Sequence, residues 1–417
     1  MRVDFNFVPN GWKKVKIAKK LFFQEGPGVR KWQFTTEGIK LLNVGNINDG
    51  KVDLSTTDKH LSTEEATGKY AHFLVDEGDL LIACSGIVVD NFHNKIAFAK
   101  KEHLPLCLNT STMRFRPLEN DVDLNYFKYF LQTAHFTSQL QKLITGSAQL
   151  NFGPSHIKKI DFLLPPLSTQ KRIAQILDNA AALRDKTQQL LSEYDQLAQS
   201  IFLEMFGDPV INQKGYDKIP LSEIVIDDKN AIVDGPFGSS IKKSDYVDQG
   251  IPIIRINNIR NEGYHDKDYK YLRREKYEEL KRSKVVQNDI LIARVGNTIG
   301  KTCIFNKNFE ALLSTTGVAK ASINQSKYNV VFIDKLMSIP TYKKYIQTFI
   351  RGAGQPYLNL TQIKSFKILR VPIKLQNQFA EKIALIEKQK ALAKQELQQS
   401  EDLFNCLLQK AFKGELV

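Results

Sequence analysis

A long amphipathic segment in the middle of the chain dominates the pattern of hydrophobic and polar positions. Residues Gln170–Phe206 contain neither glycine nor proline. Their apolar side chains recur at alternating spacings of four and three residues, with charged and amide side chains between them. The pattern predicts one helix of about 37 residues, which would be roughly 55 Å long. The apolar seam comprises Ile176, Ala180, Leu183, Thr187, Leu190, Tyr194, Leu197 and Ile201.

A seam of this length needs a partner, and a second stretch without glycine or proline, Gln376–Lys413, supplies one. Because a globular segment lies between the two helices along the chain, the simplest pairing is antiparallel. We therefore expect an intramolecular coiled coil that forms a rod with one globular domain at each end. The second seam comprises Phe379, Ile383, Ile386, Ala393, Leu397, Phe404, Leu407 and Ala411, and Lys390 and Ser400 interrupt it.

The two halves of the chain are copies of one plan. Gln170 corresponds to Gln376 at an offset of 206 residues, and this register continues without a gap to Phe206 and Phe412. The upstream match, Asp79-Leu-Leu-Ile-Ala and Asp289-Ile-Leu-Ile-Ala, has an offset of 210 residues. The agreement is close around the helices and weak elsewhere. A period this long indicates duplication of a domain with its helix, rather than a solenoid.

The repeat divides the chain into four parts. Residues 1–150 predict a first globular domain, and residues 212–356 predict a second domain of the same mixed α/β (α+β) class. Residues 151–211 form the first repeat region, with a helix at about 168–206, and residues 357–417 form the second, with a helix at about 374–413. The fold is therefore expected to have pseudo-two-fold symmetry.

Shorter patterns predict the contents of each domain. The apolar runs Asp79–Ala83 and Asp289–Ala293 are typical of buried strands. Asn125–Leu143 and Phe332–Phe349 each predict one helix. Ser168 is the expected N-cap of the first long helix. Five apolar residues near the helix ends lie off the seam and predict either packing on a domain or a docking surface: Phe202, Leu203, Met205, Leu403 and Leu408.

Charge narrows the class of partner. The chain has 59 Lys and Arg against 45 Asp and Glu, a net charge of +14 and a pI near 9.3. This balance favours a polyanion as partner, with solubility alone as the alternative. No apolar run reaches the ~18 residues of a membrane span, and the N-terminus lacks the apolar core of a signal peptide. We therefore expect a cytoplasmic protein without a membrane partner.

Catalytic motifs are not found in the sequence. The four cysteines are scattered without a Cys-x-x-Cys pair, which disfavours a disulfide framework and a zinc site. The segment Gly296–Thr302 has three residues between its glycines, whereas a phosphate-binding loop needs four. We interpret it as a turn with a basic tip at Lys301. The sequence predicts a chain that is non-catalytic by itself and holds no metal.

Clusters of basic and amide side chains in loops of both domains are candidates for DNA contact. Arg, Lys, Asn and Gln pair with base edges in the major groove, and Lys and Ser suit phosphates. Occurrence in both copies of a basic chain strengthens the interpretation. In the first domain the candidates are Arg30, Lys31 and Gln33, around Trp32, and Asn91, His93, Asn94 and Lys95. In the second they are Ser239, Lys242, Lys243, Arg255, Asn257, Asn258, Arg294, Asn297, Thr298 and Lys301.

Taken together, these features resemble the specificity subunit of type I restriction–modification systems. The shared features are two divergent domains, each followed by a repeated long helix. They also include the Gly-Ser-Ala-Gln and Gly-Ala-Gly-Gln turns, the Leu-Pro-Pro-Leu-x-x-Gln and Val-Pro-Ile-x-x-Gln lead-ins, and the Asp-Ile-Leu-Ile-Ala-Arg strand. The residue before Gln170 and Gln376 is Thr169 and Leu375, where the family commonly has Glu.

The resemblance implies a function. Each domain would read one half of a split, asymmetric target in double-stranded DNA, and the helices would set the spacing. The helices would also dock two methyltransferase (modification) subunits, which bind S-adenosylmethionine and methylate adenine. Two restriction subunits, when present, would use ATP and Mg²⁺. None of these cofactors is expected on this chain.

Three alternatives remain at this point. A methylation-only or related fused system would use the same module. A coiled-coil scaffold that binds proteins would explain the helices but not the basic, duplicated domains. A nucleotide-dependent enzyme would need Gly296–Thr302 to bind phosphate, which its spacing disfavours.

Overall fold

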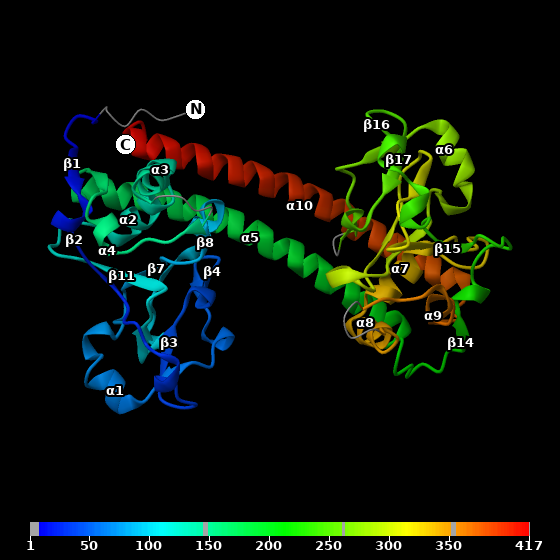
Figure 1. The fold of residues 1–417 in the computed structure, drawn as a ribbon, viewed down its shortest axis with the longest axis horizontal. Helices are drawn as coiled ribbons and strands as arrows, with labels where there is room; N and C mark the ends of the chain where they lie inside the picture. The colour runs from blue at the N-terminus through cyan, green and yellow to red at the C-terminus, as the bar shows by residue number, and fades with distance from the viewer. Residues whose placement is uncertain (1–7, 145–148, 261–262, 352–355, 417) are drawn as a thin grey trace. The chain divides into compact units, whose positions relative to one another are not determined.

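The computed structural model describes residues 8–144, 149–260, 263–351 and 356–416 (Figure 1). The chain divides into two compact units. Unit 1 comprises residues 1–187 and 396–417, and unit 2 comprises residues 188–395. Each unit holds one globular domain and a segment of both long helices. The Gly-x-x-Gln turns of the two copies, Gly146–Gln149 and Gly352–Gln355, lie outside the described residues except for Gln149.

Unit 1 contains two main sheets. The antiparallel sheet has the order β2-β11-β7-β9, and the mixed sheet β10-β3-β6 contains a parallel β10–β3 pair. β1 (Lys13–Lys16) pairs with β13 (Asp161–Leu164), immediately before the first long helix. The remaining strands are β2 (Leu21–Glu25), β3 (Ile39–Leu42), β4 (Ile47–Asn48), β5 (Lys51–Val52), β6 (His60–Leu61), β7 (Leu80–Ala83), β8 (Ile87–Val88), β9 (Ile96–Phe98), β10 (Leu106–Leu108), β11 (Thr112–Pro117) and β12 (Gln149–Leu150).

Unit 2 repeats this topology although its sequence differs. The antiparallel sheet β15-β25-β22-β23 corresponds to β2-β11-β7-β9, and β17 and β24 form a parallel pair as β3 and β10 do. The duplication therefore extends through the globular domains. The strands are β14 (Lys218–Pro220), β15 (Ile232–Asp234), β16 (Tyr246–Val247), β17 (Ile251–Ile254), β18 (Ile259–Arg260), β19 (Gly263–Tyr264), β20 (Lys270–Leu272), β21 (Lys284–Val285), β22 (Ile290–Ala293), β23 (Thr302–Ile304), β24 (Ala311–Leu313), β25 (Val318–Ala321) and β26 (Lys367–Leu369).

The predicted single helix of each domain is wrong, because both are split. The hydroxyl of Thr133 accepts a hydrogen bond from the Phe136 N–H at 3.2 Å and starts a new helix, and Pro340 does so in unit 2 because it suits the first turn. The pairs are α2 (Leu124–Leu131) with α3 (Ala134–Leu143), and α7 (Val330–Ser338) with α8 (Pro340–Gln347). The short helices are α1 (Thr63–Thr67), α4 (Pro154–Ile157), α6 (Arg274–Glu279) and α9 (Leu360–Lys364).

The two long helices are α5, of 40 residues (Leu167–Phe206), and α10, of 41 residues (Ile373–Lys413). Ser168 is not the N-cap, because the helix already includes Leu167. Gly207 ends α5 with a φ of 75°, a conformation that only glycine adopts without strain, and its N–H donates to the Leu203 carbonyl at 2.8 Å.

The helices run antiparallel within each unit. In unit 1, the early part of α5 lies against the end of α10, where the Arg184 guanidinium covers the Phe404 ring at 5.1 Å. In unit 2, the end of α5 lies against the beginning of α10. There Phe202 and Phe206 contact Phe379 at ring distances of 5.5 and 5.4 Å.

The buried face of α5 differs from the predicted seam. Leu183 and Leu197 are 44% and 47% exposed. The buried line instead passes one residue later, through Leu177 and Ala198, and rejoins the prediction at Ala180, Thr187 and the half-buried Tyr194 and Ile201. Ile176 and Leu190 are half-buried as well. The prediction failed because Arg184 and Ala198 occupy contact positions that a search for large apolar residues ignores.

The seam of α10 follows the predicted positions. Phe379, Ile383, Ile386, Ala393, Phe404 and Ala411 are buried, and Leu397 and Leu407 are half-buried. Lys390 and Ser400 do not interrupt it, since both are buried in register. The Lys390 ammonium forms an ion pair with Asp195 at 2.6 Å.

The off-seam residues pack on the domains, apart from Leu403. Phe202 joins the core of unit 2, with Leu203 and Met205 packed against it, and Leu408 joins the core of unit 1. Leu403 is exposed. The docking alternative therefore applies to Leu403 only.

A buried glutamine ties each long helix to its domain. The Gln170 carbonyl oxygen accepts from the Asp123 N–H at 2.8 Å, and its amide donates to the Pro165 carbonyl at 2.8 Å. Gln376 repeats both bonds, with the Asn329 N–H at 2.8 Å and the Val371 carbonyl at 2.7 Å. This geometry explains why the glutamine occurs in both copies.

Candidate nucleic-acid interface

Two loops at corresponding places, one after β2 and one after β15, carry the best-exposed candidates. Each begins with Gly-Pro, at Gly26 and at Gly235. The N–H of Gly26 donates to the Thr112 carbonyl at 3.1 Å, and that of Gly235 donates to the Val318 carbonyl at 3.1 Å. A side chain at either glycine would collide with the backbone of the neighbouring loop. The glycines therefore fix where both loops leave their sheets.

Each loop presents a basic pair on a braced turn. In unit 1, Arg30 and Lys31 are exposed, and the Gln33 side chain accepts from the Arg30 N–H at 3.0 Å. In unit 2, Lys242 and Lys243 are exposed, and Asp245 accepts from the Lys242 N–H at 2.7 Å. This last bond lowers the pKa of the Asp245 carboxyl.

Gln33 is corrected from a DNA-reading side chain to a brace. It is buried, and its amide donates to Glu65 and to the Tyr70 hydroxyl, both at 3.0 Å. Because its hydrogen-bonding groups have protein partners, Gln33 holds the turn that displays Arg30 and Lys31.

Asn258 needs the same correction. Its oxygen accepts from the Arg255 N–H at 2.8 Å and its amide donates to the His265 and Lys267 carbonyls. The corresponding Asn46 of unit 1 is also buried and holds an equivalent turn. The neighbouring Asn257 remains exposed, whereas Arg255 is half-buried and donates to the Asp268 carbonyl.

Arg294 is buried and braces several segments of unit 2. Its guanidinium forms an ion pair with Asp234 and donates to the carbonyls of Thr316 and Leu358, both at 2.7 Å. It therefore joins the ends of three loops and does not face solvent, contrary to the prediction of a base-reading role.

The segment after Arg294 forms a turn, as its glycine spacing predicts. A short 3-10 helix at Gly296–Thr298 leads into β23, with Gly296 and Gly300 at φ values of 70° and 81°. Asn297 and Ser239 are exposed, and Thr298 and Lys301 are half-buried.

The second cluster of unit 1 is divided between surface and interior. Asn91 and His93 are exposed, and Asn94 is half-buried. The Lys95 ammonium donates to the Val44 carbonyl at 3.2 Å and to the Asn48 side chain at 2.5 Å. Lys95 is thus held by its own domain.

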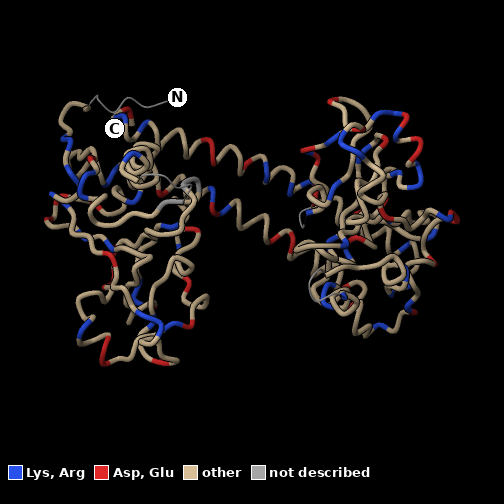
Figure 2. The backbone as a smooth tube through the Cα atoms, in the orientation of Figure 1, with Lys and Arg blue, Asp and Glu red and all other residues tan. Residues whose placement is uncertain are grey.

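Two aromatic side chains lie in the same loops as the basic pairs: Trp32 directly follows Lys31, and Phe237 precedes Lys242 by five residues. Trp32 is 80% exposed and Phe237 is 75% exposed. The sequence interpretation noted Trp32 only as a neighbour and missed Phe237. The available signal was an aromatic residue shortly after Gly-Pro and close to two adjacent cations. Other Lys and Arg residues occur on many loops and short strands of each unit (Figure 2).

The chain is similar to known specificity proteins over nearly its whole length. A family model described as the type I restriction modification DNA specificity domain matches residues 34–193. The EcoKI specificity subunit of Escherichia coli (strain K12) is 23% identical, over 98% of this chain and 90% of that protein. The StySPI specificity subunit of Salmonella potsdam is 22% identical over the same shares.

Solved structures share the fold. The type I restriction–modification S subunit from M. genitalium aligns with a TM-score of 0.52 at 16% identity, covering 99% of this chain and 98% of that chain. A chain from a study of complex assembly and conformational transition of the type I system aligns with a TM-score of 0.56 at 16% identity, covering 98% of this chain and 100% of that one. In sequence the chain is thus similar to type I restriction–modification specificity subunits, and it shares the fold of their solved structures.

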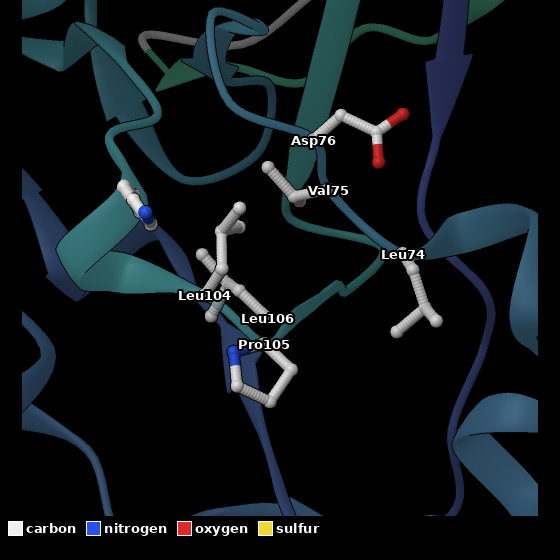
Figure 3. A pocket seen from close by; sticks show the side chains of 7 residues that line it. Leu74, Val75, Asp76, Leu104, Pro105 and Leu106 are labelled. Atoms are coloured by element: carbon white, nitrogen blue, oxygen red, sulfur yellow. The ribbon is translucent and has the colours of Figure 1, made fainter.

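Beyond these loops, the part of the chain that the structure describes shows few sites of other kinds. A hollow in unit 1 is lined mainly by apolar side chains, among them Leu104, Pro105 and Leu106, and the Asp76 carboxylate points away from them (Figure 3). That carboxylate pairs with Arg116 at 2.6 Å. Among the described residues, no group of three or more His, Cys, Asp or Glu side chains is placed to hold a metal ion. No described helix is long and apolar enough to cross a membrane.

Proposed function

We propose that this chain is the sequence-specific DNA-recognition subunit of a type I restriction–modification complex. Each globular domain reads one half of a bipartite DNA target. One observation carries the proposal: the same fold occurs twice, with the same basic pair on equivalent loops but different side chains around it. Because the reading surfaces differ, the two half-sites differ and the whole target is asymmetric.

The helices supply the spacing and the docking surface in this proposal. α5 passes from unit 1 into unit 2, and α10 returns, so one pair of helices carries both readers. Leu385 and Leu392 of α10 are one heptad apart and exposed in unit 2, and Leu403 is exposed in unit 1. Exposed leucines on a helix whose other face is paired favour a protein partner. We assign this surface to the two modification subunits.

The catalytic reactions are carried out by the partner subunits. In this proposal the modification subunits bind S-adenosylmethionine and methylate adenine, and restriction subunits, where the system has them, use ATP and Mg²⁺. The chain itself is non-catalytic and contributes target choice.

Adenine-methylation sequencing of a host that expresses the chain with its modification subunits tests the proposal. We expect one asymmetric, two-part motif. A matched variant inserts one heptad after Leu190 and one after Gln395, which face each other if the Lys390–Asp195 register continues. A heptad adds about 10.5 Å of helix, so the spacer should grow by about three base pairs while both half-sites stay the same. Methylation without a bipartite motif, or an unchanged spacer, would overturn it.

A further inference from the structure

The two exposed aromatic side chains in the loops that carry the basic pairs have no function assigned so far. Trp32 and Phe237 are the most exposed large apolar side chains of the described residues. Single exposed apolar residues are common on proteins. Two of them on equivalent loops, each of which also carries two adjacent lysine or arginine side chains, are a specific arrangement.

In both loops the backbone on either side of the aromatic residue is held in place. Gly26 and Gly235 pin the start of the loops against neighbouring backbone. Gln33 and Asp245 brace the turns that follow. An aromatic side chain held this way loses little conformational freedom on binding, which favours a contact with a ligand.

The aromatic residue occupies a different position in each loop. When residues are counted from the Gly-Pro at the start of each loop, Phe237 corresponds to Gly28 of unit 1, which has no side chain. When the two braced turns are aligned at Gln33 and Asp245, Trp32 corresponds to Ser244 of unit 2. The basic pairs, in contrast, occupy the same position relative to the braced turns in both copies. The constant cations suit the phosphates that every sequence shares, and the variable aromatics suit contacts that differ between half-sites.

We propose that Trp32 and Phe237 each stack against bases at one step of their own half-site and partly unstack that step. The inference rests on the proposed DNA-recognition function. Aromatic side chains stack on bases, and apolar side chains inserted between base pairs open and kink the duplex. Arg30 and Lys31, or Lys242 and Lys243, then neutralise the phosphates that flank the opened step.

The test uses the chain assembled with its modification subunits and a duplex that carries its methylation motif. The fluorescent base 2-aminopurine replaces one base at a time, at positions away from the methylated adenines, because methyltransferases flip those bases. We expect fluorescence to rise on binding at one step in each half-site. Phe237→Ala should abolish the rise in one half-site only, and Trp32→Ala should abolish it in the other only.

Affinity provides a second measurement. Loss of one stacked base should weaken target binding roughly tenfold or more. Phe237→Trp should retain both signals. Phe309→Ala is the matched control, since Phe309 is an exposed aromatic of unit 2 that packs on Phe305. Circular dichroism should be unchanged for all variants, because the substituted side chains are exposed.

The outcomes separate this inference from the proposed function. If the wild-type complex neither binds nor methylates a defined target, the proposed function fails. If it does both while Phe237→Ala and Trp32→Ala bind within twofold of wild type and keep both fluorescence signals, the stacking inference fails alone. Loss of assembly with the modification subunits, with DNA contacts intact, would instead identify these residues as a protein-docking surface and overturn the inference.

Discussion

Units 1 and 2 place different chemistry at the same point of the fold, at the end of the β7 and β22 strands. In unit 2, Arg294 pairs with Asp234 and donates to two carbonyls. In unit 1, Cys84 replaces the arginine, and its thiol approaches the Thr110 carbonyl at 3.5 Å. Glu25 replaces the aspartate there, and burial raises the pKa of its carboxyl.

The backbone around this point is unchanged by the exchange. The Cys84 and Arg294 N–H groups donate to the carbonyls of Ser111 and Gly317, both at 2.9 Å. Their own carbonyls accept from Phe152 and Leu358 in equivalent positions. One fold therefore tolerates a charged brace in one copy and a small buried thiol in the other. This explains why the globular parts share topology while their sequences match weakly.

The largest expected difference concerns the buried acids of β7 and β22. Asp289 is paired with one buried cation, Lys320, at 2.9 Å, whereas Asp79 has Arg116 at 2.8 Å and Arg114 at 3.6 Å. Lys320→Met should lower the free energy of unfolding of unit 2 by about 3–5 kcal/mol, because it leaves a buried carboxylate unpaired. Arg116→Met should cost about 1–2 kcal/mol in unit 1, since Arg114 remains.

Hydrogen exchange resolved by unit measures both values. Equal losses for the two variants would contradict the view that the second arginine protects Asp79.

The next difference is at the braced loops. Arg294→Met should destabilise unit 2 by about 2–3 kcal/mol, because Asp234 and two carbonyls lose a charged donor. Cys84→Ala should cost unit 1 only about 1 kcal/mol, since it removes a small side chain. Chemical denaturation of each variant provides the comparison. The double variant Asp234→Ala/Arg294→Met should lose less than the sum of the single changes, and strict additivity would argue against the pair.

The smallest difference depends on pH. His135 of unit 1, whose counterpart is Thr341 in unit 2, has a pKa lowered to about 4, chiefly by burial and then by Lys14. Between pH 6.5 and about 4 the unfolded chain binds more protons than the folded chain. The free energy of unfolding of unit 1 should therefore decrease as the pH is lowered from 6.5 to about 4, by about 1–2 kcal/mol from this group.

His135→Thr makes unit 1 resemble unit 2 at this position. The free energy of unfolding of this variant should decrease less as the pH is lowered. Denaturation of both proteins at several pH values measures the difference, which cancels the titration of carboxylates common to the two. Identical pH profiles would rule out His135 as the cause.

The fold was largely predictable from the sequence, because repetition and the lack of glycine and proline specify the two long helices. Local errors have local causes. Thr133 and Pro340 split the domain helices by capping chemistry that a periodic pattern does not detect. Leu183 and Leu197 were assigned to the α5 seam because they are large and apolar, whereas the contacts use Ala198 and the guanidinium of Arg184.

The candidate interface was predictable only in part. Arg, Asn and Gln side chains in loops can either contact bases or stabilise turns, and the residue type alone does not distinguish these two roles. Three of the candidates hydrogen-bond to the backbone of their own unit: Gln33, Asn258 and Arg294. An asparagine occurs as the third residue of the same short 3-10 helix in both copies, as Asn46 and Asn258, and this recurrence indicates the structural role. Phe237 was missed because an aromatic residue suggests a core position, and only its exposure in the structure shows otherwise.

The pair between the buried Lys390 and the exposed Asp195 also restricts how this architecture can vary. Sliding one helix by a heptad would place the Lys390 ammonium opposite Gln188 or Phe202 and leave it only Glu387 of its own helix, at 3.5 Å, as a carboxylate partner. Insertions of three or four residues in one helix would be absorbed by local over- or unwinding, whereas insertions of one or two residues would turn its seam away from its partner. Under the proposed function, the DNA spacer would therefore change with matched insertions in both helices, and a matched insertion of seven residues would lengthen it by about three base pairs.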